Sequence, residues 1–176
     1  LAAAELNRRV GTQTVHGLAN REAAAAAEIV VLTVPFANHE AIVEDITEAV
    51  QGKIVVDTTV PLVPPKVSSV QLPEGGSVAK RTQENLGENV RVVSAFQTVA
   101  AAHLAEDGPV EGEVLVCGNN VEARTVILAL VEAVGLKGWH GGPIDNSVVS
   151  ESLTPLLIFI NKRYQLNGAG IRIVGH

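Results

Sequence analysis

The sequence predicts a doubly wound α/β fold built on a parallel sheet, and two observations carry that prediction. Continuous apolar runs such as residues 29–34 alternate with helical segments, as expected for strands buried on both faces of a parallel sheet. Hydrophobic residues make up 47% of the chain but aromatic residues only 3%, a composition that suits close packing of helices against a sheet. The 176 residues are enough to bury one substantial core.

Strands and helices are expected to alternate along the chain. The predicted strands are residues 12–16, 29–34, 53–59, 90–95, 112–118 and 137–140. The predicted helices are residues 1–9, 20–27, 41–50, 77–87, 121–134 and 148–166. This order favours parallel strands joined by right-handed crossovers.

Helix N-termini are expected where a short polar side chain can accept hydrogen bonds from free N–H groups. The predicted N-caps are Asn20, Asn38, Ser77 and either Asn119 or Asn120. Helix C-termini are expected at glycine, which often follows the last helical turn. The predicted ends are Gly52, Gly87 and Gly135.

The opening unit of a Rossmann-type fold is missing from this pattern. In such a fold a G-x-G-x-x-G turn after the first strand holds the pyrophosphate of a dinucleotide. Here the glycine-rich stretches, residues 141–146 and 167–172, come too late and follow the wrong elements. We therefore expect a Rossmann-type sheet whose first strand-helix-strand unit is missing, with a small C-terminal helical segment. The apolar strand at residues 29–34 would then have an open edge that invites pairing with another chain.

Charge and composition exclude several classes of protein. A net charge of −6 and scattered Lys and Arg residues argue against a nucleic-acid surface. No apolar stretch approaches the roughly 20 residues that span a bilayer, and no signal peptide is recognisable. The single Cys117 lies in an apolar strand and is expected to be a core residue. These observations predict a cytoplasmic protein that binds neither nucleic acid nor membrane.

Three loops after predicted strands are alike, at residues 33–39, 57–64 and 95–103. Each breaks its strand with small, hydroxyl-bearing or proline residues. In open α/β sheets ligands bind at the carboxyl ends of the strands, so these loops form the expected site. Flat, small surfaces suit planar rings and phosphates, whereas a hydrolase brings a carboxylate, a histidine and a nucleophile together.

The loop motifs resemble those of one enzyme family. From about Glu28 onward, LTVPFANHEA, KIVVD with VPLVP, VVSAFQTVAAAHLA, VLVCGNN, GPIDNS, SLTPLL and NGAGIR resemble the NADPH-dependent F420 reductases, also called F420:NADP oxidoreductases. The resemblance implies hydride transfer between NADP(H) and the deazaflavin coenzyme F420, with both rings stacked face to face. It also implies a homodimer. No catalytic side chain and no metal is expected, because the two cofactors supply the reacting atoms.

The resemblance further implies that the chain has two functional parts. Residues 1–105 would be a partial Rossmann NADP-binding domain, and residues 106–176 a C-terminal part with the deazaflavin-binding and dimerisation segment. The expected cofactor-binding residues are Val34, Pro35, His39, Val63, Thr98, Ala101 and Ala169. Val34, Val63 and Ala101 would line the nicotinamide side, and Ala169 would meet the deazaflavin through main-chain groups. His39 or its neighbour Asn38 would supply a polar contact.

The sequence departs from the family pattern at several points. Gln97 stands where some members have histidine, and three residues are inserted around residues 58–60. Because the opening unit is missing, the preference for NADP over NAD is not readable. Two alternatives stay open. The chain could be a catalytically incompetent fragment that acts as a dimerisation module through SLTPLLIFI. It could also be a Rossmann reductase using another flavin or an imine acceptor, a class marked by a long all-helical dimerisation domain.

Overall fold

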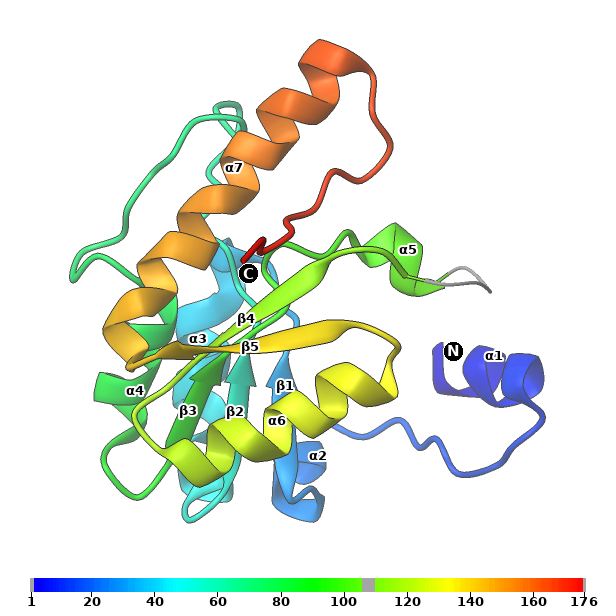
Figure 1. Cartoon of the computed structure of the whole chain (residues 1–176). Coiled ribbons are helices and arrows are strands. Elements are labelled where there is room, and N and C mark those ends of the chain that lie inside the picture. The colour runs from blue at the N-terminus through cyan, green and yellow to red at the C-terminus, as the bar shows by residue number, and fades with distance from the viewer. Residues whose placement is uncertain (1, 106–109, 176) are drawn as a thin grey trace.

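Five strands form one sheet in the order β1-β2-β3-β4-β5 in the computed structural model, which describes residues 2–105 and 110–175 (Figure 1). The strands are β1 (Ile29–Leu32), β2 (Ile54–Asp57), β3 (Arg91–Ser94), β4 (Glu113–Cys117) and β5 (Lys137–Gly142). The α-helices are α1 (Ala2–Val10), α2 (Asn20–Ala26), α3 (Phe36–Ile46), α4 (Val78–Leu86), α5 (Ala101–Ala105), α6 (Val121–Ala133) and α7 (Ser147–Tyr164). Short 3₁₀ turns are η1 (Thr47–Val50) and η2 (Ile144–Asn146).

The sheet is parallel except at one junction. β1, β2 and β3 run parallel, and β4 and β5 run parallel to each other, but β4 meets β3 antiparallel through Ser94 and Cys117. The prediction of a parallel sheet is therefore confirmed within each group of strands and wrong between the groups. As a consequence, the carboxyl ends of β1–β3 lie at the same end of the sheet as the amino ends of β4 and β5.

Helices cover both faces of the sheet, as a doubly wound fold requires. Val55 and Val92 point to one face and pack against side chains of α2, α3 and α4. Their strand neighbours Val56 and Val93 point to the other face and pack against α6. Successive side chains of a strand alternate between faces, so a strand covered on both sides needs apolar residues throughout. This is why the three central strands read as unbroken apolar runs.

Residues 12–16 do not form the strand that the sequence predicts. A strand needs a neighbour to satisfy its N–H and C=O groups, and none lies beside this segment among the described residues. The Asn7 side chain instead donates to the carbonyl of Val15 at 2.8 Å and accepts from its N–H at 3.0 Å. β1 pairs with β2 alone in the described sheet, and Val31 on β1 is 42% exposed. The expected open edge of this strand is therefore confirmed.

Two of the predicted helix caps are confirmed by hydrogen bonds. Ser77 Oγ accepts from the N–H of Lys80 at the start of α4, and Asn120 Oδ1 accepts from the N–H of Ala123 at the start of α6. Gly87 follows α4 with a φ of +81°, a conformation that glycine adopts without strain.

The caps predicted at Asn20 and Asn38 are wrong. Asn20 is the first residue of α2, and its predecessor Ala19 has its N–H bonded to Glu22 at 3.4 Å. α3 begins two residues before Asn38, directly after Pro35, whose φ of −58° already suits entry into a helix.

The predicted boundary between residues 105 and 106 falls beside residues 106–109, which lie outside the described part of the chain. β3 precedes this boundary and β4 follows it, and the two strands belong to the same sheet. The division of the chain into an NADP-binding part and a C-terminal part stays a prediction.

Gly118 marks the close approach between β3 and the end of β4. A Cβ atom at this position would lie 2.8 Å from the main-chain oxygen of Val92. We expect Gly118→Ala to lower the free energy of unfolding by about 1–3 kcal/mol, because the backbone of β3 has to shift. Urea unfolding measures the loss. Gly17→Ala is the control, since its Cβ would meet only Ala3 at 3.8 Å, and equal stability of the two variants would contradict the expectation.

Candidate functional site

Asp57, the last residue of β2, is the centre of a buried hydrogen-bond cluster at the carboxyl end of the parallel strands. His39 Nε2 on α3 lies 2.9 Å from its Oδ2, and Thr82 Oγ1 on α4 lies 2.6 Å from the same oxygen. The main-chain N–H of Thr59 donates to Oδ1 at 2.9 Å. An ionised carboxylate only accepts hydrogen bonds, so both His39 and Thr82 donate.

The cluster keeps Asp57 ionised although the residue is fully buried. Burial raises its pKa, but the hydrogen bond and the charge of His39 oppose this, together with the donors of Thr82 and Thr59. The resulting pKa of Asp57 lies below its ordinary value of 3.8. A buried carboxylate of this kind holds its partners firmly, because leaving it unpaired is costly.

Gln97 connects the loop after β3 to the same place. Its Nε2 donates to the main-chain oxygen of Asp57 and to Ser94 Oγ, each at 2.8 Å. Thr154 Oγ1 on α7 donates to the main-chain oxygen of Gln97 at 2.7 Å. Within the described structure, the buried Oε1 of Gln97 and the buried Oγ1 of Thr59 have no hydrogen-bond partner. Buried polar atoms without partners are rare, and they point to a bound group or water at the carboxyl ends of β2 and β3.

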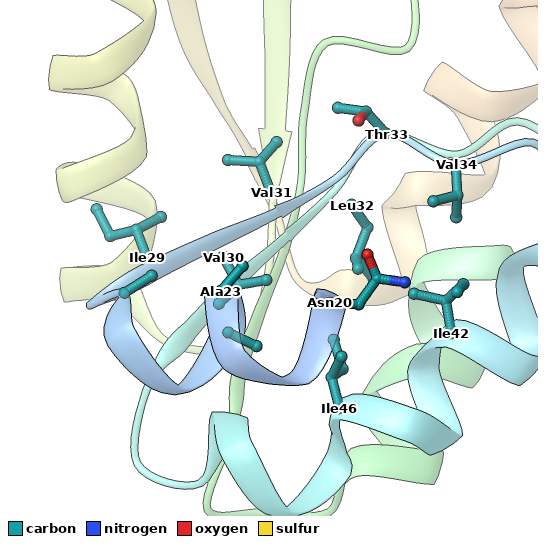
Figure 2. A pocket seen from close by; sticks show the side chains of 12 residues that line it. Asn20, Ala23, Ile29, Val30, Val31, Leu32, Thr33, Val34, Ile42 and Ile46 are labelled. Carbon is teal, nitrogen blue, oxygen red and sulfur yellow. The ribbon is translucent and has the colours of Figure 1, made fainter. Parts of the chain in front are cut away.

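Val34 lies in an apolar pocket of about 310 Å³ beside the free edge of β1. Figure 2 shows Thr33 and Val34 at the carboxyl end of this strand, with Asn20 from α2 and Ile42 and Ile46 from α3. Aliphatic side chains dominate the lining. Beside these apolar side chains, the edge of β1 carries main-chain N–H and C=O groups that pair with no other strand of the described sheet.

The other residues predicted to bind the cofactor near the carboxyl ends of β1, β2 and β3 lie in different environments. Pro35 and Val63 are exposed in the loops after β1 and β2, and Ala101 is exposed at the start of α5. Thr98 is buried, and its Oγ1 lies 3.5 Å from the main-chain oxygen of Glu113. His39 points inward to Asp57 and not into the pocket beside β1. Direct contact of these residues with a cofactor stays a prediction.

Ala169 lies in a second pocket, of about 760 Å³, between the C-terminal segment and the amino ends of β4 and β5. Its N–H already donates to Asn161 Oδ1 at 2.8 Å. The neighbouring Gly168 lies against the imidazole of His103, leaving no room for a Cβ atom. His103 belongs to α5, so the C-terminal segment and the loop expected to line the nicotinamide side are in contact (Figure 1).

Glu113 holds the end of the C-terminal segment against the sheet. Its Oε2 accepts from the N–H of Ile173 at 2.6 Å and from Trp139 Nε1 at 2.8 Å. Its main-chain N–H donates to the oxygen of Ile171 at 3.1 Å. The Ile173 N–H is the main cause that keeps the pKa of Glu113 below its ordinary value. Two hydrogen bonds, to Ile171 and from Ile173, thus hold the C-terminal segment that forms one wall of the second pocket.

Glu151 attaches α7 to the start of α4. Its carboxylate accepts from the N–H groups of Val78 at 2.8 Å and Ala79 at 3.1 Å, and from Ser77 Oγ at 2.9 Å. Ser77 Oγ also contacts Ser147 Oγ. The first N–H groups of a helix lack partners within it, so a carboxylate there is favourable. Burial nevertheless raises the pKa of Glu151, because the residue is only 1% exposed.

Sequence reasoning missed both buried acids. The signal for Asp57 is an acid that closes an otherwise apolar strand, and the signal for Glu151 is an acid set between serines on an amphipathic helix. Neither signal names the partner, because His39 is 18 residues from Asp57, and Ser77 is 74 residues from Glu151.

Cys117 is buried and free, and burial raises the pKa of its thiol to about 11. This fits the expected core residue. No cluster of His, Cys, Asp or Glu side chains among the described residues is arranged to hold a metal ion. The helices within the described ranges include none with the length and apolar character needed to cross a membrane.

The fold is shared with solved structures of several proteins. A protein from Arthrobacter sp. FB24, crystallised as a candidate F420-dependent NADP reductase, superposes with a TM-score of 0.77 at 23% identity, over 90% of this chain and 74% of that one. A pyrroline-5-carboxylate reductase from Coxiella burnetii gives a TM-score of 0.59 at 17% identity, over 92% of this chain and 54% of that one. At these identities the likeness concerns the fold alone.

Sequence comparisons identify the family. A family model described as NADP oxidoreductase, coenzyme F420-dependent, matches residues 2–61. The F420-dependent NADP reductase of Methanocaldococcus jannaschii is 39% identical over 162 residues, covering 89% of this chain and 72% of that protein. The corresponding reductase of Methanothermobacter marburgensis is 33% identical over 165 residues, covering 90% of this chain and 74% of that protein. The chain belongs to the family of F420-dependent NADP reductases.

Proposed function

We propose that this protein transfers a hydride between NADP(H) and the deazaflavin coenzyme F420. The observation that carries the proposal is the 39% identity to the Methanocaldococcus jannaschii reductase over 72% of that protein. Family membership does not favour the alternatives of an inactive dimerisation module or an imine reductase.

The arrangement of the site supports this chemistry. Hydride transfer between two ring carbons needs close, rigid stacking and the exclusion of water, while the coenzymes supply the reacting atoms. Exposed or half-exposed apolar residues lie in the loops after β1 and β2 (Val34, Pro35 and Val63) and at the start of α5 (Ala101). We propose that these residues face the nicotinamide ring, and that the segment around Ala169 faces the deazaflavin.

We also propose that the enzyme is a cytoplasmic homodimer that does not bind nucleic acid. Val149, Leu156 and Phe159 recur along one side of α7, and each is about half exposed. Their spacing makes an apolar stripe suited to a second copy of the chain. The net charge of −6 supports the absence of nucleic-acid binding. A cytoplasmic location fits the use of two diffusible coenzymes.

NADPH-dependent bleaching of oxidised F420 by the purified protein tests the activity. We expect bleaching of the deazaflavin with NADPH and no reduction of FMN under the same conditions. Parallel assays with NADH measure the nucleotide preference. A folded sample that bleaches no F420 with either nucleotide would contradict the proposal.

A further inference from the structure

One residue, Asp57, makes hydrogen bonds to the start of α3 and to the loops after β2 and β3, all on the proposed nicotinamide side. Its Oδ2 accepts from His39 in the first part of α3, which follows the β1 loop. Its Oδ1 accepts from the N–H of Thr59 in the β2 loop. Its main-chain oxygen accepts from the Gln97 side chain in the β3 loop. The side chain of Asp57 therefore links the start of α3 to the β2 loop, and its main-chain oxygen holds the β3 loop.

The His39 bond matters most for the β1 loop, because it is made close to the turn. α3 begins at Phe36, directly after Val34 and Pro35, and His39 is the fourth residue of the helix. Fixing His39 fixes the first turn of α3, and with it the direction in which Val34 and Pro35 leave β1.

A second polar contact of α3, made to α4, is an exposed ion pair and not a buried one. Arg81 pairs with Glu40 at 3.2 Å on the surface, and the Glu40 side chain is 76% exposed. Exposed pairs of this type contribute little, whereas buried charged pairs depend strongly on having both partners. Thr82 strengthens the buried pair, since its Oγ1 bonds the same Asp57 oxygen and lies 3.3 Å from His39 Nε2.

We propose that Asp57, His39 and Thr82 are positioning residues that hold the loops after β1 and β2 in register for the nicotinamide nucleotide. The inference rests on the proposed function, because it assigns the loops to NADP(H). It gives His39 a role that acts through Asp57, in place of the direct cofactor contact expected from the sequence. Catalytic sites need supporting contacts of this kind, because small displacements of the binding groups are costly.

Four variants test the proposal. His39→Leu removes the donor to Asp57, whereas His39→Gln offers an amide nitrogen at similar reach and should restore it. Thr82→Val removes the second donor while keeping the shape of the side chain. Glu40→Gln breaks only the exposed pair with Arg81 and is the matched control. Thermal unfolding of each variant establishes that it is folded.

Two measurements that do not require turnover show the effect of each variant. Binding of NADPH is followed by its fluorescence, and amide hydrogen exchange is followed in residues 33–40 and 58–63. We expect His39→Leu and Thr82→Val to weaken NADPH binding by about tenfold and to speed exchange in both segments. His39→Gln and Glu40→Gln should stay within about twofold of the parent protein.

Steady-state kinetics separate positioning from a purely structural role. We expect the KM for NADPH to rise in His39→Leu with a smaller change in the KM for F420, and to recover in His39→Gln. Folded His39→Leu protein with unchanged NADPH binding and unchanged exchange would overturn the proposal, as would a parent protein that binds no NADPH. A parent protein that binds NADPH with the expected variant pattern but reduces no F420 would overturn only the proposed acceptor.

Discussion

Replacing Glu151 by leucine is expected to lower the free energy of unfolding by about 3 kcal/mol, because three buried donors at the start of α4 lose their acceptor. These donors are the N–H groups of Val78 and Ala79 and the hydroxyl of Ser77. Glu151→Gln should cost less, since one amide oxygen remains to accept. Urea unfolding measures both losses, and Glu132→Leu on the exposed side of α6 is the control.

The same variants have a defined pH dependence. Burial raises the pKa of Glu151 above its ordinary value of 4.5. A raised folded-state pKa means that the contribution of Glu151 is fully present below about pH 4.5 and is lost as the pH rises through the raised pKa. Glu151→Gln should lack this loss of stability on the alkaline side. Equal pH profiles for Glu151→Gln and the parent protein would contradict the placement of Glu151.

The sequence predicts the strands of this fold better than their pairing. β2 and β3 are readable because both faces of each strand are covered, which leaves an unbroken apolar run. β1 carries the same apolar run although its Val31 is exposed. The direction of β4 is not readable, because its own residues are as apolar as those of a parallel strand. The error at residues 12–16 has a similar origin, since a strand pattern has no effect without a neighbouring strand.

Only part of the candidate site could likewise be predicted from the sequence. The loops that gather at the carboxyl ends of β1–β3 could be predicted, because parallel strands bring their loops to one end of a sheet. The pairing of His39 with Asp57 could not, since it depends on how α3 and α4 pack over β2. A histidine in a candidate loop reads as a ligand contact by sequence, and only the packing shows that it faces an internal acid.

Replacing Asp57 by alanine is expected to have the largest effect on stability, about 3–5 kcal/mol, because it leaves buried donors from α3, from α4 and from the β2 loop without an acceptor. The affected side chains are His39 and Thr82, together with the N–H of Thr59. Asp57→Asn should cost less because it keeps one side-chain oxygen. Asp45→Asn, on the exposed side of α3, is the control and should change stability by less than about 0.5 kcal/mol.

A double-mutant cycle shows whether the loss arises from the His39–Asp57 pair. Combining His39→Leu with Asp57→Ala should destabilise the protein by less than the sum of the single losses, because the first change already removes the bond that the second would break. Additive losses would mean that the two residues stabilise the fold separately, against the 2.9 Å contact between them.

The pH dependence of Asp57 has the opposite sign to that of Glu151. The pKa of Asp57 lies below 3.8, so its contribution is present above that pH and is lost as the pH falls through the folded-state pKa. The two acids also interact, because the negative charge of Asp57 raises the pKa of Glu151. Asp57→Asn should therefore remove the loss of stability in acid, and it should make the loss due to Glu151 smaller and move it to lower pH. Unfolding free energies measured across the pH range for Asp57→Asn, Glu151→Gln and the double variant test this coupling. An unchanged alkaline limb in Asp57→Asn would mean that the two buried acids titrate independently, although α4 bonds to both of them.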